Sequence, residues 1–246
     1  MASRVDEDPR VLPAAAEKAA TVRRMFGAIA PRYDLLNHLL SLNMDRRWRR
    51  RAVDILLRDS SLSGTYLDAC AGTLDLGHEL ARRVDFTGRV LACDFTPEML
   101  QWGKEKATGI RLFPAAGDTL ALPLRDASID GAMVGFGVRN LADLDVGLVE
   151  LGRVLRPGAK LVILEFTTPA WQPFRSLYLF YFRRVLPRVG RIVSSHDTAY
   201  TYLPASVLQF PEPAALAARM EAAGFRNVSW QRRTGGIVAI HSGDRH

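Results

Sequence analysis

The segment Tyr66-Leu-Asp-Ala-Cys-Ala-Gly-Thr-Leu-Asp75 decides the fold, and the remaining chain is arranged around it. Its first residues are apolar and predict a short strand that leads into Asp68. Small residues and one glycine follow, and from Leu74 onward the pattern becomes helical. A strand that passes through small residues into a helix brings backbone N–H groups close to a ligand above the sheet. The segment therefore predicts a nucleotide-like cofactor site, with an ordinary strand–helix turn as the alternative.

The composition is that of a globular protein with a sizeable core. The chain has 246 residues, of which 48% are hydrophobic and 24% charged, and this length suits one large or two small domains. The net charge of +7 is compatible with nucleic acid, an anionic membrane surface or a generally basic proteome. Two cysteines, Cys70 and Cys93, predict buried reduced thiols rather than a metal site or a disulfide. Because we find neither a signal peptide nor a long apolar run, we expect a cytoplasmic protein.

Strands and helices alternate along the middle of the chain, which predicts a parallel sheet with right-handed crossovers. The last two predicted strands are joined by a short glycine turn and should form an antiparallel edge hairpin. Helices are expected at 74–83, from Thr96 with its hydroxyl as the cap, at 144–155, which stops at Pro157, and at 213–223. The expected strands are 65–67, 88–93, 110–115, 129–134, 161–164, 228–232 and 237–240.

The flanking segments predict one domain, 21–246, preceded by a mobile tail over residues 1–20. Residues 21–60 predict a helical lid that breaks at Pro31. Residues 171–210 are rich in aromatic side chains and predict a cap, with breaks at Pro187 and Pro204.

Within the lid, the basic run Asp45-Arg-Arg-Trp-Arg-Arg-Arg51 is typical of a solvated helix face anchored by its tryptophan. The alternative is a contact with anionic lipid or with a cofactor carboxylate.

The predicted strand ends indicate which ligand the sheet binds. In an open parallel sheet, ligands lie beyond the carboxyl ends of the strands, which here carry Asp68, Asp94, Asp118 and the segment Gly135 to Asn140. Asp94 is suited to accept both hydroxyls of a ribose and would repel a 2′-phosphate; a solvated acid at a strand end is the alternative. The loop lacks a full G-x-G-x-x-G motif, which disfavours a pyrophosphate. A ligand with adenine and ribose but no phosphate, such as S-adenosylmethionine, fits better.

Longer motifs carry a family resemblance that extends from about Val22 to Gly243. They are Phe26-Gly-Ala-Ile-Ala-Pro-Arg-Tyr-Asp34 with Asn37, Arg46-Arg-Trp48, Phe136-Gly-Val-Arg-Asn140, Arg153-Val-Leu-Arg-Pro-Gly158, Leu164-Glu-Phe166 with Pro169, Tyr202-Leu203, Phe210-Pro211 and Gly236-Ile-Val-Ala-Ile-His241. With these motifs the chain resembles the class I S-adenosylmethionine-dependent C-methyltransferases of menaquinone and ubiquinone biosynthesis. The resemblance implies an α/β Rossmann-like fold with a mostly parallel seven-stranded sheet, an antiparallel C-terminal hairpin, a helical lid and an aromatic cap.

The resemblance also implies the site. The residues implied for S-adenosylmethionine are Asp68, Gly72, Thr73, Asp94, Asp118, Thr119 and Gly135. Arg139 and Asn140 are the catalytic candidates, for phenolate stabilisation and ring positioning, and capping of their own loop is the alternative. Tyr33 is expected to close over cofactor or substrate. We expect no metal, and a structural role for His241.

The chain departs from the family in its cofactor loop. The usual Gly-Gly-Thr-Gly-Asp is replaced by Ala71-Gly-Thr-Leu-Asp75, and a positive φ at Leu74 would be costly. Asp118 stands where the family commonly has Asn, Gly135 where it has Ser, and Asp45 where it often has His.

The implied reaction is methylation of a polyprenylated quinol ring. Demethylmenaquinol is favoured over the polyprenyl-methoxy-benzoquinol of ubiquinone biosynthesis, and another small-molecule methyltransferase remains an alternative. A nonenzymatic cofactor or nucleic-acid binder is disfavoured because the basic residues are not interleaved with a base-stacking platform. The cap and lid should receive the apolar tail, and the basic charge suggests peripheral contact with anionic lipid at the inner face of the membrane. A homodimer is left open.

Overall fold

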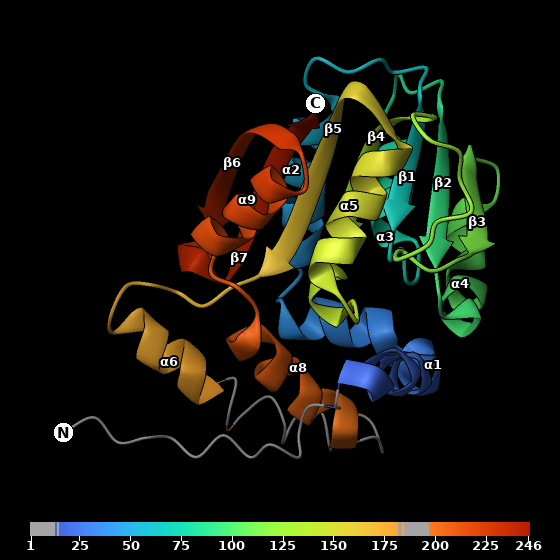
Figure 1. Ribbon diagram of the computed structural model, residues 1–246. Coiled ribbons are helices and arrows are strands. Elements are labelled where there is room, and N and C mark those ends of the chain that lie inside the picture. Colours follow the sequence, from blue (N-terminus) through green and yellow to red (C-terminus); the bar gives the residue numbers. More distant parts are fainter. Residues whose placement is uncertain (1–12, 14, 182–183, 185–196) are drawn as a thin grey trace.

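The computed structural model describes residue 13, residues 15–181, residue 184 and residues 197–246. Its centre is a seven-stranded sheet in the order β3-β2-β1-β4-β5-β7-β6 (Figure 1). The strands are β1 (Thr65–Ala69), β2 (Arg89–Asp94), β3 (Leu112–Ala116), β4 (Ile129–Gly135), β5 (Leu155–Phe166), β6 (Phe225–Arg233) and β7 (Val238–Arg245). The first five strands pair in parallel, whereas β7 runs antiparallel to both β5 and β6. The predicted mixed sheet is confirmed.

Alternating residues of the strands build a core on each face of the sheet. Tyr66 points to the face covered by α2 (Met44–Leu57) and α3 (Asp75–Ala81). Leu67 points to the opposite face, where α5 (Leu144–Val154) and α9 (Pro213–Ala222) pack. Both side chains are fully buried, so a one-residue shift of β1 would exchange the two cores.

The predicted element boundaries differ from the observed ones by a few residues. The helix expected at 144–155 ends at Val154 rather than at Pro157, because β5 begins at Leu155 and pairs with Ile129 of β4. α4 (Pro97–Gly103) begins with the expected proline, but the hydroxyl of Thr96 makes no capping hydrogen bond. The Asp94 carboxylate instead accepts the N–H of Thr96 at 2.8 Å.

The predicted helix break at Pro31 is wrong. A single helix, α1 (Ala15–Leu40), continues through this proline and lies below the tips of the parallel strands (Figure 1). It begins inside the segment expected to be a tail. A proline inside a helix costs roughly 3 kcal/mol. Packing offsets this cost, because Ile29 is buried and Phe26 and Tyr33 pack against the same small cluster on either side of the proline.

The cap region contains α6 (Phe174–Phe180) and α8 (Asp197–Gln209). The predicted break at Pro204 is wrong, since this residue lies inside α8. Pro187 lies outside the described residues. Phe174 on α6 lies against Gly235 of η4 (Thr234–Gly236), where an added Cβ would come within 2.5 Å of the phenyl ring.

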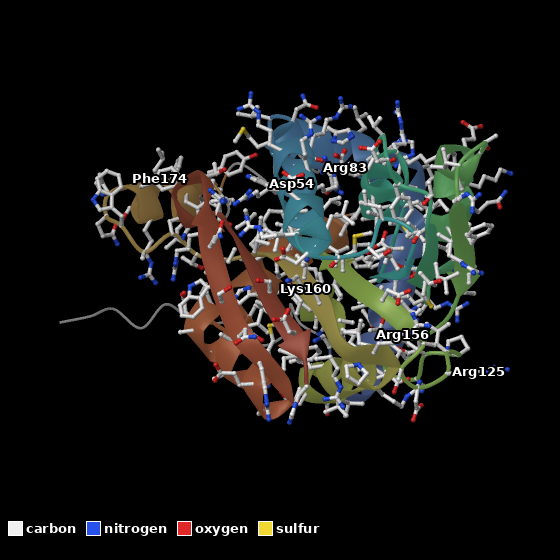
Figure 2. All side chains as sticks on the ribbon, turned by 90° about the horizontal axis from the view of Figure 1, so that it is seen from above. Asp54, Arg83, Arg125, Arg156, Lys160 and Phe174 are labelled. Atoms are coloured by element: carbon white, nitrogen blue, oxygen red, sulfur yellow. The ribbon has the colours of Figure 1, made fainter. Side chains whose placement is uncertain are left out.

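Ion pairs secure the surface around the lid. Arg83, just after α3, binds Asp54 of α2 at 2.7 Å and so holds these two helices together (Figure 2). Among the described helices, none combines the length and the apolar content that a membrane crossing requires.

Candidate functional site

A cleft lies at the carboxyl ends of the parallel strands, where the chain order of the sheet reverses beside β1. The loops after β1, β2, β3 and β4 form its floor, and α1 covers it. Its lining includes Ala19, Phe26, Tyr33, Cys70, Gly72, Asp94, Phe95, Thr96, Met99, Asp118, Thr119, Leu120, Gly135, Phe136, Gly137 and Asn140. Five of the seven residues predicted for the cofactor thus meet in one cleft: Gly72, Asp94, Asp118, Thr119 and Gly135.

Asp94 is the buried acid of the cleft. Its side chain lies at the end of β2 and is 6% exposed. One carboxylate oxygen accepts the N–H of Gly72 at 2.8 Å, and the other accepts the N–H of Thr96. Burial raises the pKa of Asp94, and these backbone hydrogen bonds oppose the rise. Each oxygen retains acceptor capacity, so the carboxylate can still accept hydroxyl groups of a ligand.

The loop after β1 has an unusual backbone. Cys70, Gly72 and Leu74 have φ values of 52°, 53° and 71°, all in the left-handed region. Leu74 therefore adopts the conformation that glycine would favour, and its side chain is fully buried. The loop packs directly against the backbone of α4 at Gly103. A Cβ added to Gly103 would lie 2.5 Å from the carbonyl oxygen of Thr73, so no side chain fits there.

Two predicted cofactor residues lie outside the lining of the cleft. The Asp68 carboxylate is buried below the loop and accepts the N–H of Gly77 in α3 at 2.7 Å. Burial raises the pKa of Asp68 to about 8. The Thr73 hydroxyl donates to Asp34 of α1. In this arrangement Asp68 supports the loop and Thr73 binds the lid.

Polar contacts near both ends of α1 hold this helix over the cleft. Near its first turn, Lys18 donates to the carbonyl oxygens of Arg139 at 3.1 Å and Leu141 at 2.6 Å. Toward its other end, Asp34 pairs with Lys106 of η1 (Lys104–Ala107) at 2.6 Å. Lys18 belongs to the stretch expected to be a mobile tail, but it lies in α1 and makes these two contacts.

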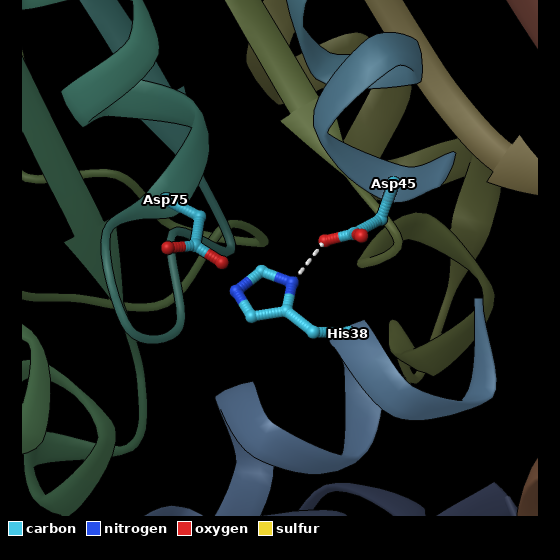
Figure 3. A group of neighbouring side chains, drawn as sticks. All are labelled: His38, Asp45 and Asp75. Atoms are coloured by element: carbon cyan, nitrogen blue, oxygen red, sulfur yellow. Dashed lines mark hydrogen bonds and ion pairs between the residues drawn. The ribbon is translucent and has the colours of Figure 1, made fainter. Parts of the chain in front are cut away.

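The histidine and two aspartates in Figure 3 resemble a metal site in their spacing, since ligand atoms of His38, Asp45 and Asp75 lie within 4.8 Å of one another. Cations of the protein already neutralise both carboxylates. Arg49 pairs with Asp45 and, at 3.1 Å, with Asp75, which Lys106 also binds at 2.5 Å. Burial opposes ionisation of Asp75, but Arg49 and Lys106 hold its pKa below the usual value. We assign the cluster to joining the lid to α3.

The burial of Arg49 differs from the prediction that the basic run 45–51 forms a solvated helix face. The run does not form one solvated face, because Arg49 is 7% exposed and Trp48 is 4% exposed, whereas Arg46 and Arg47 face solvent. The Trp48 indole N–H donates to Thr234 at 2.8 Å.

Arg139 and Asn140 lie in η2 (Val138–Asn140), directly after β4. The guanidinium of Arg139 binds the buried carboxylate of Glu165 at 2.8 Å and the carbonyl oxygen of Phe136. Its Nε–H is buried and has no hydrogen-bond partner within the described part of the chain. The Asn140 side chain accepts a hydrogen bond from the Tyr202 hydroxyl at 3.1 Å. Asn140 lines the cleft, whereas Arg139 does not and instead lines a neighbouring cavity together with Lys18 and Tyr202. Both residues make contacts beyond capping their own loop.

Tyr33 reaches the same region from α1. It lines the cleft and stacks edge-on with Phe26 at 5.8 Å between ring centroids. Burial raises the pKa of the Tyr33 hydroxyl, while Asn37 and the charge of Arg139 oppose the rise. The phenol is therefore neutral near pH 7.

An apolar cavity of about 460 Å³, open to solvent, adjoins the cleft. Phe136, which lines the cleft, stacks on Phe166, which lines the cavity, with 4.5 Å between ring centroids. The Arg139 guanidinium carbon lies 5.6 Å from the Phe166 ring centroid. The cavity is lined by Asn37, Ser41, Leu42, Met44, Trp48, Phe166, Phe174, Leu177, Tyr178, Tyr181, Leu203, Thr234 and Ile237.

Comparison with known proteins assigns the chain. Residues 14–245 match the ubiE/COQ5 methyltransferase family. The chain belongs to this family. It is 46% identical over 231 residues to the demethylmenaquinone methyltransferase of Deinococcus radiodurans, covering 93% of this chain and 94% of that protein. It is 42% identical over 236 residues to the ubiquinone/menaquinone biosynthesis C-methyltransferase UbiE of Geobacter sp. strain M21, covering 94% and 99%.

Solved structures show the same fold at lower sequence identity. A SAM-dependent methyltransferase from Thermotoga maritima superimposes with a TM-score of 0.64 at 16% identity, covering 91% of this chain and 99% of that one. As a member of the ubiE/COQ5 family, the chain is a methyltransferase whose cofactor is S-adenosylmethionine.

The cleft of this family member fits the cofactor. The buried Asp94 carboxylate supplies acceptors for a ribose diol, and the apolar side chains of Phe95 and Met99 can flank an adenine. At Gly72 an added Cβ would meet only the Met99 side chain, at 3.5 Å, so the backbone there is open to a ligand. Asp118 is exposed and Thr119 buried, next to the same space.

Sequence reasoning missed several residues of the site. Sequence analysis includes Glu165 in a motif but assigns no role in the site to Glu165, Lys18 or Tyr202. The signal for Glu165 was a single acid inside the apolar run Leu161–Phe166, which a buried strand carries only when the charge is paired. The imidazole of His241 forms a hydrogen bond with the Pro213 carbonyl oxygen at 3.0 Å, away from the cleft lining.

Proposed function

We propose that the enzyme transfers a methyl group to a ring carbon of a polyprenylated quinol, with demethylmenaquinol as the preferred substrate. The main observation behind this proposal is the contact between the walls of the two cavities. Phe136 of the cofactor cleft stacks on Phe166 of the large apolar cavity, and the Arg139 guanidinium carbon lies 5.6 Å from the Phe166 ring centroid. The cleft also carries the polar side chains of Asp94 and Asn140. A molecule with a polar ring and a long apolar tail matches this combination. The names of the relatives from Deinococcus and Geobacter support quinone methylation.

Arg139 has the charge that the chemistry needs. S-adenosylmethionine, when bound, supplies an electrophilic methyl group, so the protein must hold the ring carbon in line and exclude water. The ring carbon becomes more nucleophilic as its hydroxyl loses a proton, and a nearby cation stabilises the resulting phenolate. An arginine side chain does not ordinarily act as a base in proteins, so we assign Arg139 to phenolate stabilisation. Its unpartnered Nε–H is a buried donor that a ring oxygen would satisfy.

Asn140 and Tyr33 complete the proposed ring site. The hydrogen bond from Tyr202 holds the Asn140 side chain beside the cleft, where its amide can position the ring. Tyr33 comes from the lid, so its hydroxyl and ring reach the substrate only when α1 covers the cleft. Lid closure would then exclude water from the methyl transfer.

Methyl transfer measured on both reduced quinols, each with a short prenyl tail, tests this function. We expect transfer to both rings, faster to the naphthoquinol, and a loss of at least about 100-fold in kcat for Arg139→Ala. Arg125→Ala is the control, because Arg125 is exposed and does not line the cleft; Figure 2 shows it at the edge of the molecule. A faster benzoquinol reaction would reassign the substrate, and an unchanged rate for Arg139→Ala would remove Arg139 from the mechanism.

The same proposal includes peripheral contact with anionic lipid, because the apolar tail comes from a bilayer. Two side chains that line the apolar cavity are also strongly exposed, Leu42 at 82% and Leu177 at 64%. Phe180 of α6 and Trp171, just before this helix, are further exposed apolar side chains. Together with the net charge of +7, these exposed side chains favour an anionic membrane surface.

Vesicle flotation at low salt tests the membrane contact. Leu42→Ser with Leu177→Ser should weaken binding to anionic vesicles, whereas Val84→Ser should not, since Val84 is 98% exposed but lies apart from the cavity. Equal binding by both variants, or none by the wild type, would refute the contact without affecting the proposed reaction.

A further inference from the structure

Glu165 is the buried acid at the proposed ring site. It is the penultimate residue of β5 and only 1% exposed. One oxygen accepts from Arg139 Nη1 and from the Phe166 N–H, both at 2.8 Å. The other oxygen accepts the backbone N–H of Arg139 at 3.3 Å. A single carboxylate therefore holds the backbone of η2, the guanidinium of Arg139 and the end of its own strand.

These contacts determine which donors of Arg139 remain for a ligand. Nη1 is used by Glu165 and by the Phe136 carbonyl oxygen. The Nε–H has no protein partner within the described residues, although it is fully buried. A buried orphan donor calls for a partner from outside the chain, and fixing one end of a planar guanidinium also fixes the direction of its other donors.

We propose that Glu165 is a positioning residue that clamps Arg139 by its backbone and by Nη1, so that the Nε–H is presented to a ring oxygen of the substrate. The inference rests on the proposed function, because it concerns the same ring. It also explains why a strand of apolar residues carries an acid at this position. Without the carboxylate, the guanidinium would turn toward other acceptors, and a displacement of about 1 Å can cost on the order of 100-fold in rate.

The kinetic test is a double-mutant cycle on short-tail quinol. Glu165→Gln keeps the shape but places an amide donor against the donors of Arg139. We expect kcat to fall roughly 10- to 100-fold, with little change in the KM for quinol, and Glu165→Asp to recover part of the loss. In an Arg139→Gln background, Glu165→Gln should change kcat less than about twofold. The proposal would be overturned if Glu165→Gln lowered kcat by the same factor in the wild type and in the Arg139→Gln background.

Glu150→Gln is the matched control. Glu150 on α5 likewise accepts from an arginine, Arg153 at 2.7 Å, and from a backbone N–H, that of Leu122 at 2.6 Å, but it lies outside the cleft lining. Its substitution should leave kcat unchanged. Thermal unfolding of every variant separates a loss of folded protein from a loss of rate.

A second readout is independent of turnover. In protein labelled with ¹⁵N-arginine, the Arg139 Nε–H signal, identified by its absence in Arg139→Lys, should exchange at least about tenfold faster in Glu165→Gln than in Glu150→Gln. Equal exchange in the two variants would refute the clamp. If the wild type methylates neither quinol, the proposed function fails, and this measurement still decides whether Glu165 holds Arg139.

Discussion

Asp34 in the lid helix and Lys106 beside α4 form an ion pair of 2.6 Å across the edge of the cofactor cleft. The pair joins segments 72 residues apart in sequence. The hydroxyl of Thr73, in the loop that follows β1, donates to the same carboxylate. The lid is thus bound to the loop that it covers. Opening the lid to exchange the cofactor therefore requires a few polar contacts to break.

Replacing Asp34 with Asn should loosen the lid. Both partners are partly exposed, and such pairs contribute about 0.2–1 kcal/mol, so we expect lid opening to increase by about 1.4- to 5-fold. The release rate of S-adenosylmethionine in stopped-flow measurements should rise by a similar factor. Asp145→Asn, which breaks an exposed pair with Arg219 at 3.0 Å, is the control and should leave release unchanged. Equal release rates for Asp34→Asn and wild type would show that the lid is held by other contacts.

Asp94→Asn should weaken binding of the cofactor. A hydrogen bond to a charged group contributes about 1.5–3 kcal/mol, so loss of one such bond to the ribose raises Kd by roughly 10- to 100-fold. Titration calorimetry with S-adenosylmethionine measures the effect. Asp85→Asn, at an exposed position away from the cleft, should bind as the wild type does. Because Asp94 also accepts two backbone N–H groups, urea unfolding must accompany the titration.

Leu74→Gly should destabilise the protein even though it removes an unfavourable backbone conformation. The positive φ of Leu74 costs roughly 1–2 kcal/mol, whereas truncating a buried leucine costs about 2–5 kcal/mol. Leu42 provides the comparison, because it has a φ of 51° but is 82% exposed, and Leu42→Gly should be nearly neutral. Urea unfolding measures both; a gain in stability for Leu74→Gly would mean that the backbone strain outweighs the packing.

Asp68 should make stability depend on pH. Its pKa is about 8 in the folded protein because burial raises it, and about 3.9 in the unfolded chain. Between these values the folded state retains a proton that the unfolded state releases, so this group lowers stability as pH rises, by up to about 1.4 kcal/mol per pH unit.

Asp68→Asn should remove this contribution. The difference in unfolding free energy between wild type and variant should therefore shift against the wild type between pH 5 and pH 8, as measured by urea unfolding at each pH. A difference that does not change with pH would indicate that the folded carboxyl group is already ionised.

The order of strands and helices along the chain, the mixed sheet and the acids at the strand ends could all be predicted from the amino-acid sequence. Alternating apolar residues such as Tyr66 and Leu67 carry this information locally, because each must face one side of the sheet. The family motifs added the catalytic pair Arg139 and Asn140 as a prediction. The helix ends predicted from proline were less accurate, because α1 continues through Pro31 and α8 through Pro204 in the packed structure.

The contacts between these residues could not be predicted from the sequence and became visible in the folded chain. The partners of Arg139 come from distant positions, with Lys18 from α1 and Glu165 from β5, and no local pattern encodes such pairings. The structure likewise placed Asp68 beneath the loop and Leu74 in the left-handed region, because the space around them is set by α3 and α4. Burial and charge pairing depend on which segments meet in the folded chain, and that is a property of the whole fold.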